Sequence, residues 1–107
     1  MKAKIKLLTK KEINKVIKKF PLWKLDAKST KFSRTFEFEK QIDALIFIAR
    51  TTVNAEILKH HPDIHFTYCQ VKMTVTSHEL KGLTKTDVQL LGKIEMVALK
   101  QAVDNDQ

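Results

Sequence analysis

The chain has 107 residues, of which 43% are apolar and 30% are charged, with only two glycines and two prolines. This length fits one domain, over residues 1–107, and the composition excludes a linker, a disordered tail or a multidomain protein. The formal net charge is +8, and 12 of the 20 basic residues lie within residues 1–34. Lysines without interleaved arginine and aromatic residues are typical of a solvated helix face, so we do not expect direct binding to nucleic acid.

The first elements are marked by a capping pattern and by two prolines. Thr9-Lys10-Lys11-Glu12 is a capping box that opens a helix, and Pro21 ends this helix. Residues 22–26 and 32–38 alternate apolar and polar side chains around a turn at 27–30, which predicts two antiparallel strands. Residues 40–59 repeat apolar side chains at helical spacing until Pro62 stops the pattern.

The second half of the chain adds a strand and a helix. Residues 66–76 contain no Gly or Pro and alternate in polarity, which predicts one long strand with Cys69 in the core. A loop with Gly82 follows, and Thr84-Lys85-Thr86-Asp87 opens a last helix to about Ala102, with a frayed tail from residue 104. The order predicts an α+β fold in which helices cover one apolar face of an antiparallel sheet.

The sequence also indicates the cellular compartment. Cys69 is the only cysteine and cannot form an internal disulfide, so a cytoplasmic location is the default expectation. No segment approaches the ~20 apolar residues of a membrane helix. Lysines near the start have no apolar stretch behind them, so we expect neither a membrane span nor a secretory signal.

Residue types suited to acid–base chemistry are concentrated between Glu56 and Asp87. Glu56 and His60 lie four residues apart, which predicts a hydrogen bond between them on one helix face. His78 follows the predicted long strand and Asp87 lies in the first turn of the last helix, so a shared cleft at these element ends is plausible. Adjacent His60 and His61 point about 100° apart on a helix, and there is no Cys pair, so we expect no metal site.

Each of these residues also has a purely structural interpretation. His60 and His61 are favoured at a helix end by the helix dipole, and Asp87 caps its helix. Trp23 fits a partly buried packing position, and His65 fits an exposed position at a strand start. The combined spacing of these residues favours a functional role over these alternatives.

The spacing of several residues resembles the signature of the pterin-4a-carbinolamine dehydratase family. The motif consists of Glu56, the run His60-His61-Pro62, Tyr68, His78 and Asp87. Further likeness covers Trp23, the segment Arg34-Thr35-Phe36-x-Phe38, the run Thr76-Ser77-His78 and the segment Gly82-Leu83-Thr84. The resemblance extends over about residues 9–102, although Ile64 stands where family members often have an aromatic residue.

This resemblance implies a fold and an activity. The fold is a sheet of four antiparallel strands with helices on one side, assembled into dimers and tetramers. The activity is the dehydration of a 4a-hydroxytetrahydropterin to a quinonoid dihydropterin during tetrahydrobiopterin recycling, without a metal or organic cofactor. The implied catalytic and pterin-contacting residues are His60, His61 and His78. The implied supporting or substrate-binding residues are Glu56, Asp87, Trp23, Pro62, Thr76 and Ser77.

For the dehydration that the resemblance implies, residue chemistry suggests roles for the three histidines. We expect His60 to donate the proton, because Glu56 can hold it, with His78 as its counterpart and His61 positioning the pterin. Two other function classes stay open. The chain could serve as a dimerisation cofactor or binding module for a helical partner such as a transcription factor, or as a small basic nucleic-acid-binding domain.

Surplus apolar surface predicts self-association. The helices expected at 40–59 and 84–102 carry more apolar side chains than one sheet-facing stripe requires. Residues 45–48 are four consecutive apolar residues, so at least one of them faces away from its own core. We expect a homodimer at minimum and a homotetramer as the resemblance implies.

Overall fold

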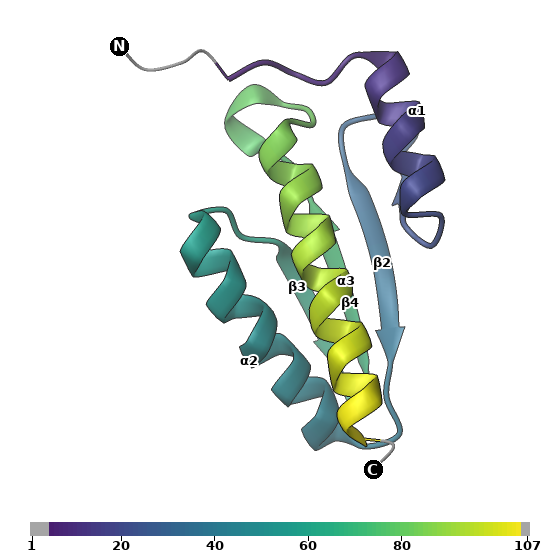
Figure 1. The fold of residues 1–107 in the computed structure, drawn as a ribbon, viewed down its shortest axis with the longest axis vertical. Helices are drawn as coiled ribbons and strands as arrows, with labels where there is room; N and C mark the ends of the chain where they lie inside the picture. The colour runs from purple at the N-terminus through teal and green to yellow at the C-terminus, as the bar shows by residue number, and fades with distance from the viewer. Residues whose placement is uncertain (1–4, 106–107) are drawn as a thin grey trace.

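One layer of the molecule is an antiparallel sheet and the other is formed by helices (Figure 1). In this computed structural model, which describes residues 5–105, the four strands stand in the order β1-β2-β4-β3. The strands are β1 (Lys24–Leu25), β2 (Phe32–Glu37), β3 (Asp63–Thr67) and β4 (Gln70–Val75). The helices are α1 (Lys10–Lys19), α2 (Gln41–Leu58) and α3 (Lys85–Asn105), with a short 3₁₀ turn η1 (His78–Leu80). The predicted α+β class with a four-stranded sheet is confirmed.

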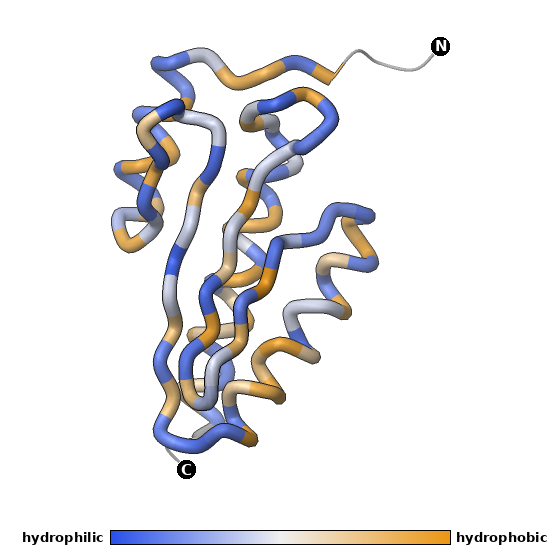
Figure 2. Tube along the Cα trace, turned by 180° about the vertical axis from the view of Figure 1, so that it is seen from behind, coloured by the Kyte–Doolittle hydropathy of each residue, from blue (hydrophilic) through white to orange (hydrophobic). Residues whose placement is uncertain are grey.

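The core lies between the sheet and the helices. Figure 2 shows the molecule from behind, with the strands in front of the helices. Alternate residues of β4 point inward, so Val71, Met73 and Val75 are fully buried. They meet Leu90 and Ile94 of α3, which are also fully buried. One apolar sheet face covered by helices is what the alternation in the sequence requires.

Helix α1 begins and ends where the capping box and Pro21 predict. Thr9 Oγ1 accepts from the Glu12 N–H at 3.2 Å, and Glu12 Oε1 accepts from the Thr9 N–H at 2.9 Å, which completes the predicted capping box. The Thr9 N–H holds the pKa of Glu12 below its ordinary value. The helix ends at Lys19, just before Pro21.

Helix α2 ends before its two histidines. The helix stops at Leu58, and Lys59 takes a left-handed conformation with φ of 55°. The His60 N–H then donates to the Ala55 carbonyl at 3.1 Å, as in other left-handed helix ends. His60 and His61 therefore lie beyond the helix and do not continue its last turn.

The single long strand predicted over 66–76 is wrong. The structure has a hairpin, in which β3 and β4 pair antiparallel and Phe66 lies opposite Val71. The turn residues are Tyr68, with φ of 48°, and Cys69. The turn shifts the apolar alternation by one residue, from Ile64 and Phe66 in β3 to Val71 and Met73 in β4. It uses no glycine, which is the usual mark of such a turn, so the sequence pattern did not reveal it. Cys69 is half-buried and lies in the turn, which corrects its expected place in the core.

The segment after β4 is tied to the N-terminal part of the chain. The Leu8 N–H donates to the Leu83 carbonyl at 2.7 Å. A Cβ on Gly82 would lie 2.7 Å from Leu7 Cδ2, so glycine permits this close approach. Helix α3 continues to Asn105, beyond the predicted end near Ala102, and residues 106–107 of the predicted frayed tail lie outside the described residues.

Helix α2 leaves part of its apolar surface uncovered. In the run 45–48, Phe47 is fully buried and Ile48 packs partly against the core, whereas Leu45 and Ile46 are 49% and 37% exposed. At least one of these four residues does face away, as expected. In the part of the chain that the structure describes, no helix has the length and apolar character needed to cross a membrane.

Candidate active site

Most of the predicted site residues meet at one end of the sheet. Strand β4 ends at Val75, which lies opposite Phe32 at the start of β2. Strand β3 begins beside the same end, with Asp63 opposite Thr74. The chain leaving α2, the loop after β4 and the start of α3 therefore converge here (Figure 1).

Asp87 is the buried centre of this cluster. Its side chain is fully buried, and Oδ1 lies 2.5 Å from His60 Nε2. Oδ2 accepts from the Ser77 hydroxyl at 2.7 Å and from the Thr84 N–H at 2.8 Å. The bond from Thr84 is the helix-capping role expected for Asp87, so one carboxylate both caps α3 and holds a histidine. A buried carboxylate needs such donors, and here they also fix its orientation.

The predicted hydrogen bond between Glu56 and His60 is wrong. Glu56 Oε1 lies 3.1 Å from His61 Nε2, whereas His60 is held by Asp87. The expected pairing required the helix to continue through His60, but the left-handed Lys59 turns the chain away first. The Glu56–His61 pair is exposed at both side chains, at 70% and 53%, whereas His60 is only 19% exposed.

His78 has a carboxylate partner that the sequence analysis did not single out. Its Nε2 lies 3.2 Å from Asp63 Oδ2, and both side chains are mostly exposed. Asp63 directly follows Pro62 and begins β3, so its place beside the histidine run was the available signal. Thr84, which holds Asp87, belongs to the predicted capping pattern and to the segment Gly82-Leu83-Thr84, but it was not among the predicted site residues.

Thr76 and Pro62 shape the backbone around the histidines. Thr76 is buried, and its hydroxyl donates to the Thr30 carbonyl at 2.6 Å, which joins the end of β4 to the turn before β2. Its Oγ1 also lies 3.3 Å from the Gly82 carbonyl, across the loop that carries His78. Pro62 is half-buried between His61 and Asp63. Neither residue offers a group that can titrate.

Trp23 is placed apart from the histidines. It is 3% exposed and packs edge-on against Phe36, with ring centroids 6.2 Å apart. Its Nε1–H donates to Glu95 Oε1 at 2.7 Å, and Arg34 pairs with the same carboxylate. Trp23 is not among the residues that line the cleft beside His78. The structure therefore gives Trp23 a packing position in the core.

The three site histidines share one arrangement. His60, His61 and His78 each direct Nε2 toward a different carboxylate, from Asp87, Glu56 and Asp63 respectively. When Nε2–H is donated, the neutral ring keeps a lone pair on Nδ1, and the protonated ring has an acidic Nδ1–H. Each Nδ1 is thus suited to accept or donate a proton. His65, on β3, is exposed, as expected.

A cleft of about 660 Å³ adjoins this cluster. It is lined by Thr76, His78 and Lys81 on one side and by residues of the 26–31 turn on the other. This volume is in the range of small-molecule sites. Among residues 5–105, no group of three or more His, Cys, Asp or Glu side chains is arranged to hold a metal ion.

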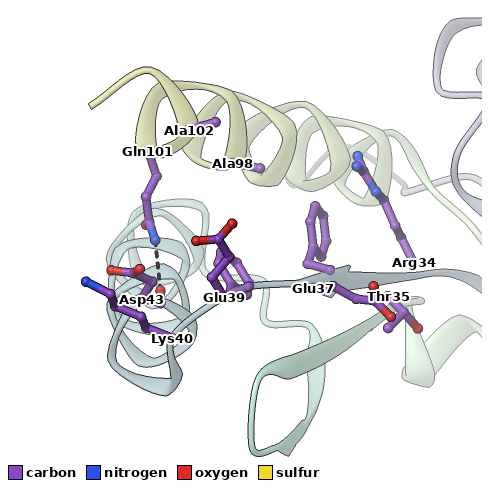
Figure 3. A pocket seen from close by; sticks show the side chains of 11 residues that line it. Arg34, Thr35, Glu37, Glu39, Lys40, Asp43, Ala98, Gln101 and Ala102 are labelled. Carbon is purple, nitrogen blue, oxygen red and sulfur yellow. Dashed lines mark hydrogen bonds between the residues drawn. The ribbon is translucent and has the colours of Figure 1, made fainter. Parts of the chain in front are cut away.

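A second cleft, of about 760 Å³, lies at the other end of the sheet (Figure 3). It is bounded by the end of β2, the start of α2 and the end of α3, where Gln101 donates to the Asp43 carbonyl at 2.8 Å. Its lining includes Glu39 and Lys40 but no histidine and none of the predicted site residues. We assign the candidate active site to the histidine cluster, because acid–base groups converge there.

Comparison with known proteins gives a consistent family assignment. Residues 6–97 match the family model for pterin 4 alpha carbinolamine dehydratase. A curated relative from Picosynechococcus sp., named after the same dehydratase, is 36% identical over 91 residues, which is 84% of this chain and 96% of the relative. A relative from Acidobacterium capsulatum with the same name is 35% identical over 82% of this chain and 94% of its own length.

Solved structures match the fold. A crystal structure from Brucella melitensis, described as a transcriptional coactivator/pterin dehydratase, has a TM-score of 0.82 at 28% identity, covering 87% of this chain and 99% of that one. A pterin dehydratase-like protein, described as a RuBisCO assembly factor in the alpha-carboxysome, has a TM-score of 0.61 at 18% identity, covering 71% and 88%. The second likeness concerns the fold alone.

Proposed function

The chain belongs to the pterin-4a-carbinolamine dehydratase family of hydro-lyases, and we propose that its histidines catalyse the dehydration by acid–base chemistry. The substrate is a 4a-hydroxytetrahydropterin and the products are a quinonoid dihydropterin and water. The C4a–O bond breaks as the hydroxyl takes up a proton, the N5–H loses a proton, and a C4a=N5 double bond forms. The reaction therefore needs one acid, one base and no change in oxidation state.

The His60–Asp87 pair is the observation that carries this proposal. The buried carboxylate holds the ring through Nε2 at 2.5 Å, and His60 still exposes 19% of its side chain. A carboxylate that fixes one ring nitrogen orients the other nitrogen toward a substrate. His60 is accordingly the proposed proton donor to the 4a-hydroxyl. Asp87 acts through His60 as a positioning residue, with Ser77 holding Asp87 in turn.

The remaining histidines complete the proposed site. His78 lines the cleft and takes the counterpart role near N5, directly or through a water. His61, held by Glu56, positions the pterin ring. Thr76 and Pro62 support these groups by fixing the loop after β4 and the chain before β3. Trp23 packs in the core and donates to Glu95, so we assign it no direct role among the histidines.

The dehydration is proposed to proceed without a metal or organic cofactor. Proton transfers suffice for the reaction, and the three histidines are directed to three separate carboxylates instead of a common point. The proposed setting is tetrahydrobiopterin recycling in the cytoplasm. The lone Cys69, which cannot form an internal disulfide, is consistent with such a compartment.

A homo-oligomer, as a dimer or tetramer, is part of the proposal. Helix α2 exposes Ile57, Val53 and Ile42 to 74%, 61% and 56%, besides Leu45. A row of exposed apolar residues on one helix is typical of a subunit contact, and two-fold symmetry lets the same helix meet its copy.

The exposed face of α2 also favours a second candidate function. A helical protein partner, such as a transcription factor, could be dimerised by the same apolar residues. The Brucella melitensis structure is described as a transcriptional coactivator as well as a pterin dehydratase. This role would be compatible with the dehydratase activity, since the α2 face and the histidine cluster are formed by different residues.

Stopped-flow absorbance tests the dehydratase function. The 4a-hydroxytetrahydropterin is generated in situ, and its disappearance is followed with wild type, His60→Ala or His65→Ala. His65 is an exposed histidine on β3 outside the cluster, so His65→Ala is the matched control. We expect acceleration over the uncatalysed decay by wild type and by His65→Ala, and a loss of about 10²-fold or more in His60→Ala.

A further inference from the structure

The cleft beside His78 is lined by three lysines. Lys28 and Lys31 come from the turn between β1 and β2, and Lys81 follows η1. Building on the dehydratase function proposed above, we propose that this cleft binds an anionic group, a phosphate or a carboxylate, on the side chain of the pterin substrate. Pterins with a negatively charged side chain would then be bound in addition to those with the neutral side chain of tetrahydrobiopterin, and more tightly.

The turn that carries two of these lysines is fixed by Asp26. Its Oδ1 accepts from the Thr30 N–H at 2.6 Å and from the Lys31 N–H at 2.9 Å. Its Oδ2 accepts from the Thr30 hydroxyl at 2.8 Å. Burial alone would raise the pKa of Asp26, but these hydrogen bonds together hold it below its ordinary value. These hydrogen bonds therefore fix the backbone of the turn that carries Lys28 and Lys31.

The third lysine is positioned by the loop that carries His78. Lys81 has a left-handed backbone with φ of 52°, and its N–H donates to the His78 carbonyl at 3.2 Å. Lys81 and His78 are therefore parts of one short turn. A group bound by Lys81 lies beside the proposed catalytic histidine.

The charge of the cleft favours an anion. Among its lining residues, three lysines stand against the single carboxylate of Asp26, and both oxygens of that carboxylate are engaged by its own turn. Within residues 5–105, none of the three lysines forms an ion pair with a carboxylate. Asp63 is paired with the ring of His78. Unpaired ammonium groups along a concave surface raise the local concentration of anions and bind phosphate as point charges.

The position of the cleft favours contact with the side chain of the substrate and not with its ring. His78 belongs to both the histidine cluster and the cleft wall, because it pairs with Asp63 on the β3 side and lines the cleft on the β2 side. A pterin ring held among the histidines can extend its substituent past His78 and Thr76 toward the 26–31 turn. The lysines would contact that substituent and leave C4a and N5 to the histidines.

Binding of stable oxidised pterins, read from their own fluorescence, tests this assignment. Three ligands are compared: one with a neutral dihydroxypropyl side chain, one with the same side chain as a phosphate ester, and one with a glutamate-bearing side chain. The proteins are wild type, the cleft variant K28Q/K31Q/K81Q and the control variant K11Q/K15Q/K18Q. Both variants remove three exposed lysines, so they lose the same net charge, but the control lysines lie on α1.

We expect wild type at low salt to bind at least one anionic pterin about tenfold more tightly than the neutral one. The cleft variant should lose this preference, and the control variant should keep it. The ligand with the larger preference distinguishes phosphate from carboxylate. Equal affinities for all three ligands, or an equal loss in both variants, would overturn the assignment. The rate at which wild type dehydrates a 4a-carbinolamine with the neutral dihydroxypropyl side chain is measured separately. Failure of the dehydratase function is therefore distinguished from failure of the anion-binding assignment.

Discussion

His60 Nε2 lies 2.5 Å from Asp87 Oδ1, although 27 residues separate the two in the chain. The pair joins the end of α2 to the first turn of α3, with the carboxylate fully buried and the imidazole accessible at its edge. Ser77 and Thr84, which lie in the segment between β4 and α3, donate hydrogen bonds to the carboxylate. The packing of three elements and the proposed acid–base chemistry therefore depend on one side chain.

Neutralising Asp87 is expected to reduce catalysis more than neutralising Glu56. In Asp87→Asn the ring of His60 loses the carboxylate that orients it, so kcat should fall about 10²-fold with a small change in KM. Glu56→Gln makes the same chemical change at an exposed pair, and its effect should stay below about tenfold. Steady-state kinetics and thermal unfolding of both variants check this. Equal losses in kcat would mean that His60 does not depend on Asp87.

The histidines are expected to act as a unit. His60→Ala and His78→Ala should each lower kcat/KM by about 10²-fold or more, and the double variant should lose less than the product of the two. His61→Ala should mainly raise KM, because His61 is proposed to position the ring. Near-wild-type values in both folded single variants would rule out the proposed acid–base roles.

Dehydratase activity is expected to survive removal of divalent metals. Proton transfer by imidazoles needs no Lewis acid, and the three histidines are each directed to their own carboxylate. Activity is compared before and after exhaustive treatment with a chelator, and again after addition of zinc. Loss of activity with recovery on zinc would identify the histidines as ligands.

Stability at low pH should depend on Asp26. Because hydrogen bonds hold its pKa in the folded state below the unfolded value of about 4, its contribution is fully present above that value. The contribution is lost as pH falls through the folded pKa. Thermal midpoints of wild type and Asp26→Asn should differ at pH 5–7 and converge toward pH 2–3. A difference that grows on acidification would contradict this sign.

Light scattering at micromolar concentration should give at least twice the mass of one 12.4 kDa chain. Val53→Lys and Ile57→Lys place charges on the exposed face of α2 and should shift the protein toward smaller species. Leu22→Lys, at an apolar residue that is 64% exposed outside the helices, is the matched control and should leave the mass unchanged. A concentration-independent monomer would show that the α2 face needs no second subunit.

The sequence was most informative where a local pattern determines the structure. The capping box at Thr9 and Glu12, the alternation in β2 and the apolar period of α2 each depend on nearby residues, and each prediction is confirmed. The β3–β4 hairpin was missed because Tyr68 adopts a positive φ without the glycine that marks such turns.

The partners of the histidines could not be derived from spacing. The expected Glu56–His60 bond assumed a helix through His60, but Lys59 ends it, and the partner then comes from α3. Asp63 belongs to β3, a strand whose start was placed too late in the chain. These contacts depend on how distant elements pack, which a one-dimensional pattern does not encode.

Rapid mixing of a freshly generated 4a-hydroxytetrahydropterin with the protein tests the central claim most directly. The absorbance of the 4a-carbinolamine is followed with no protein, with wild type and with His60→Ala/His78→Ala. Wild type should accelerate its disappearance in proportion to protein concentration, and the folded double variant should lose most of that acceleration. Decay at the uncatalysed rate with folded wild type, or unchanged acceleration in the double variant, would contradict histidine-based dehydration by this chain.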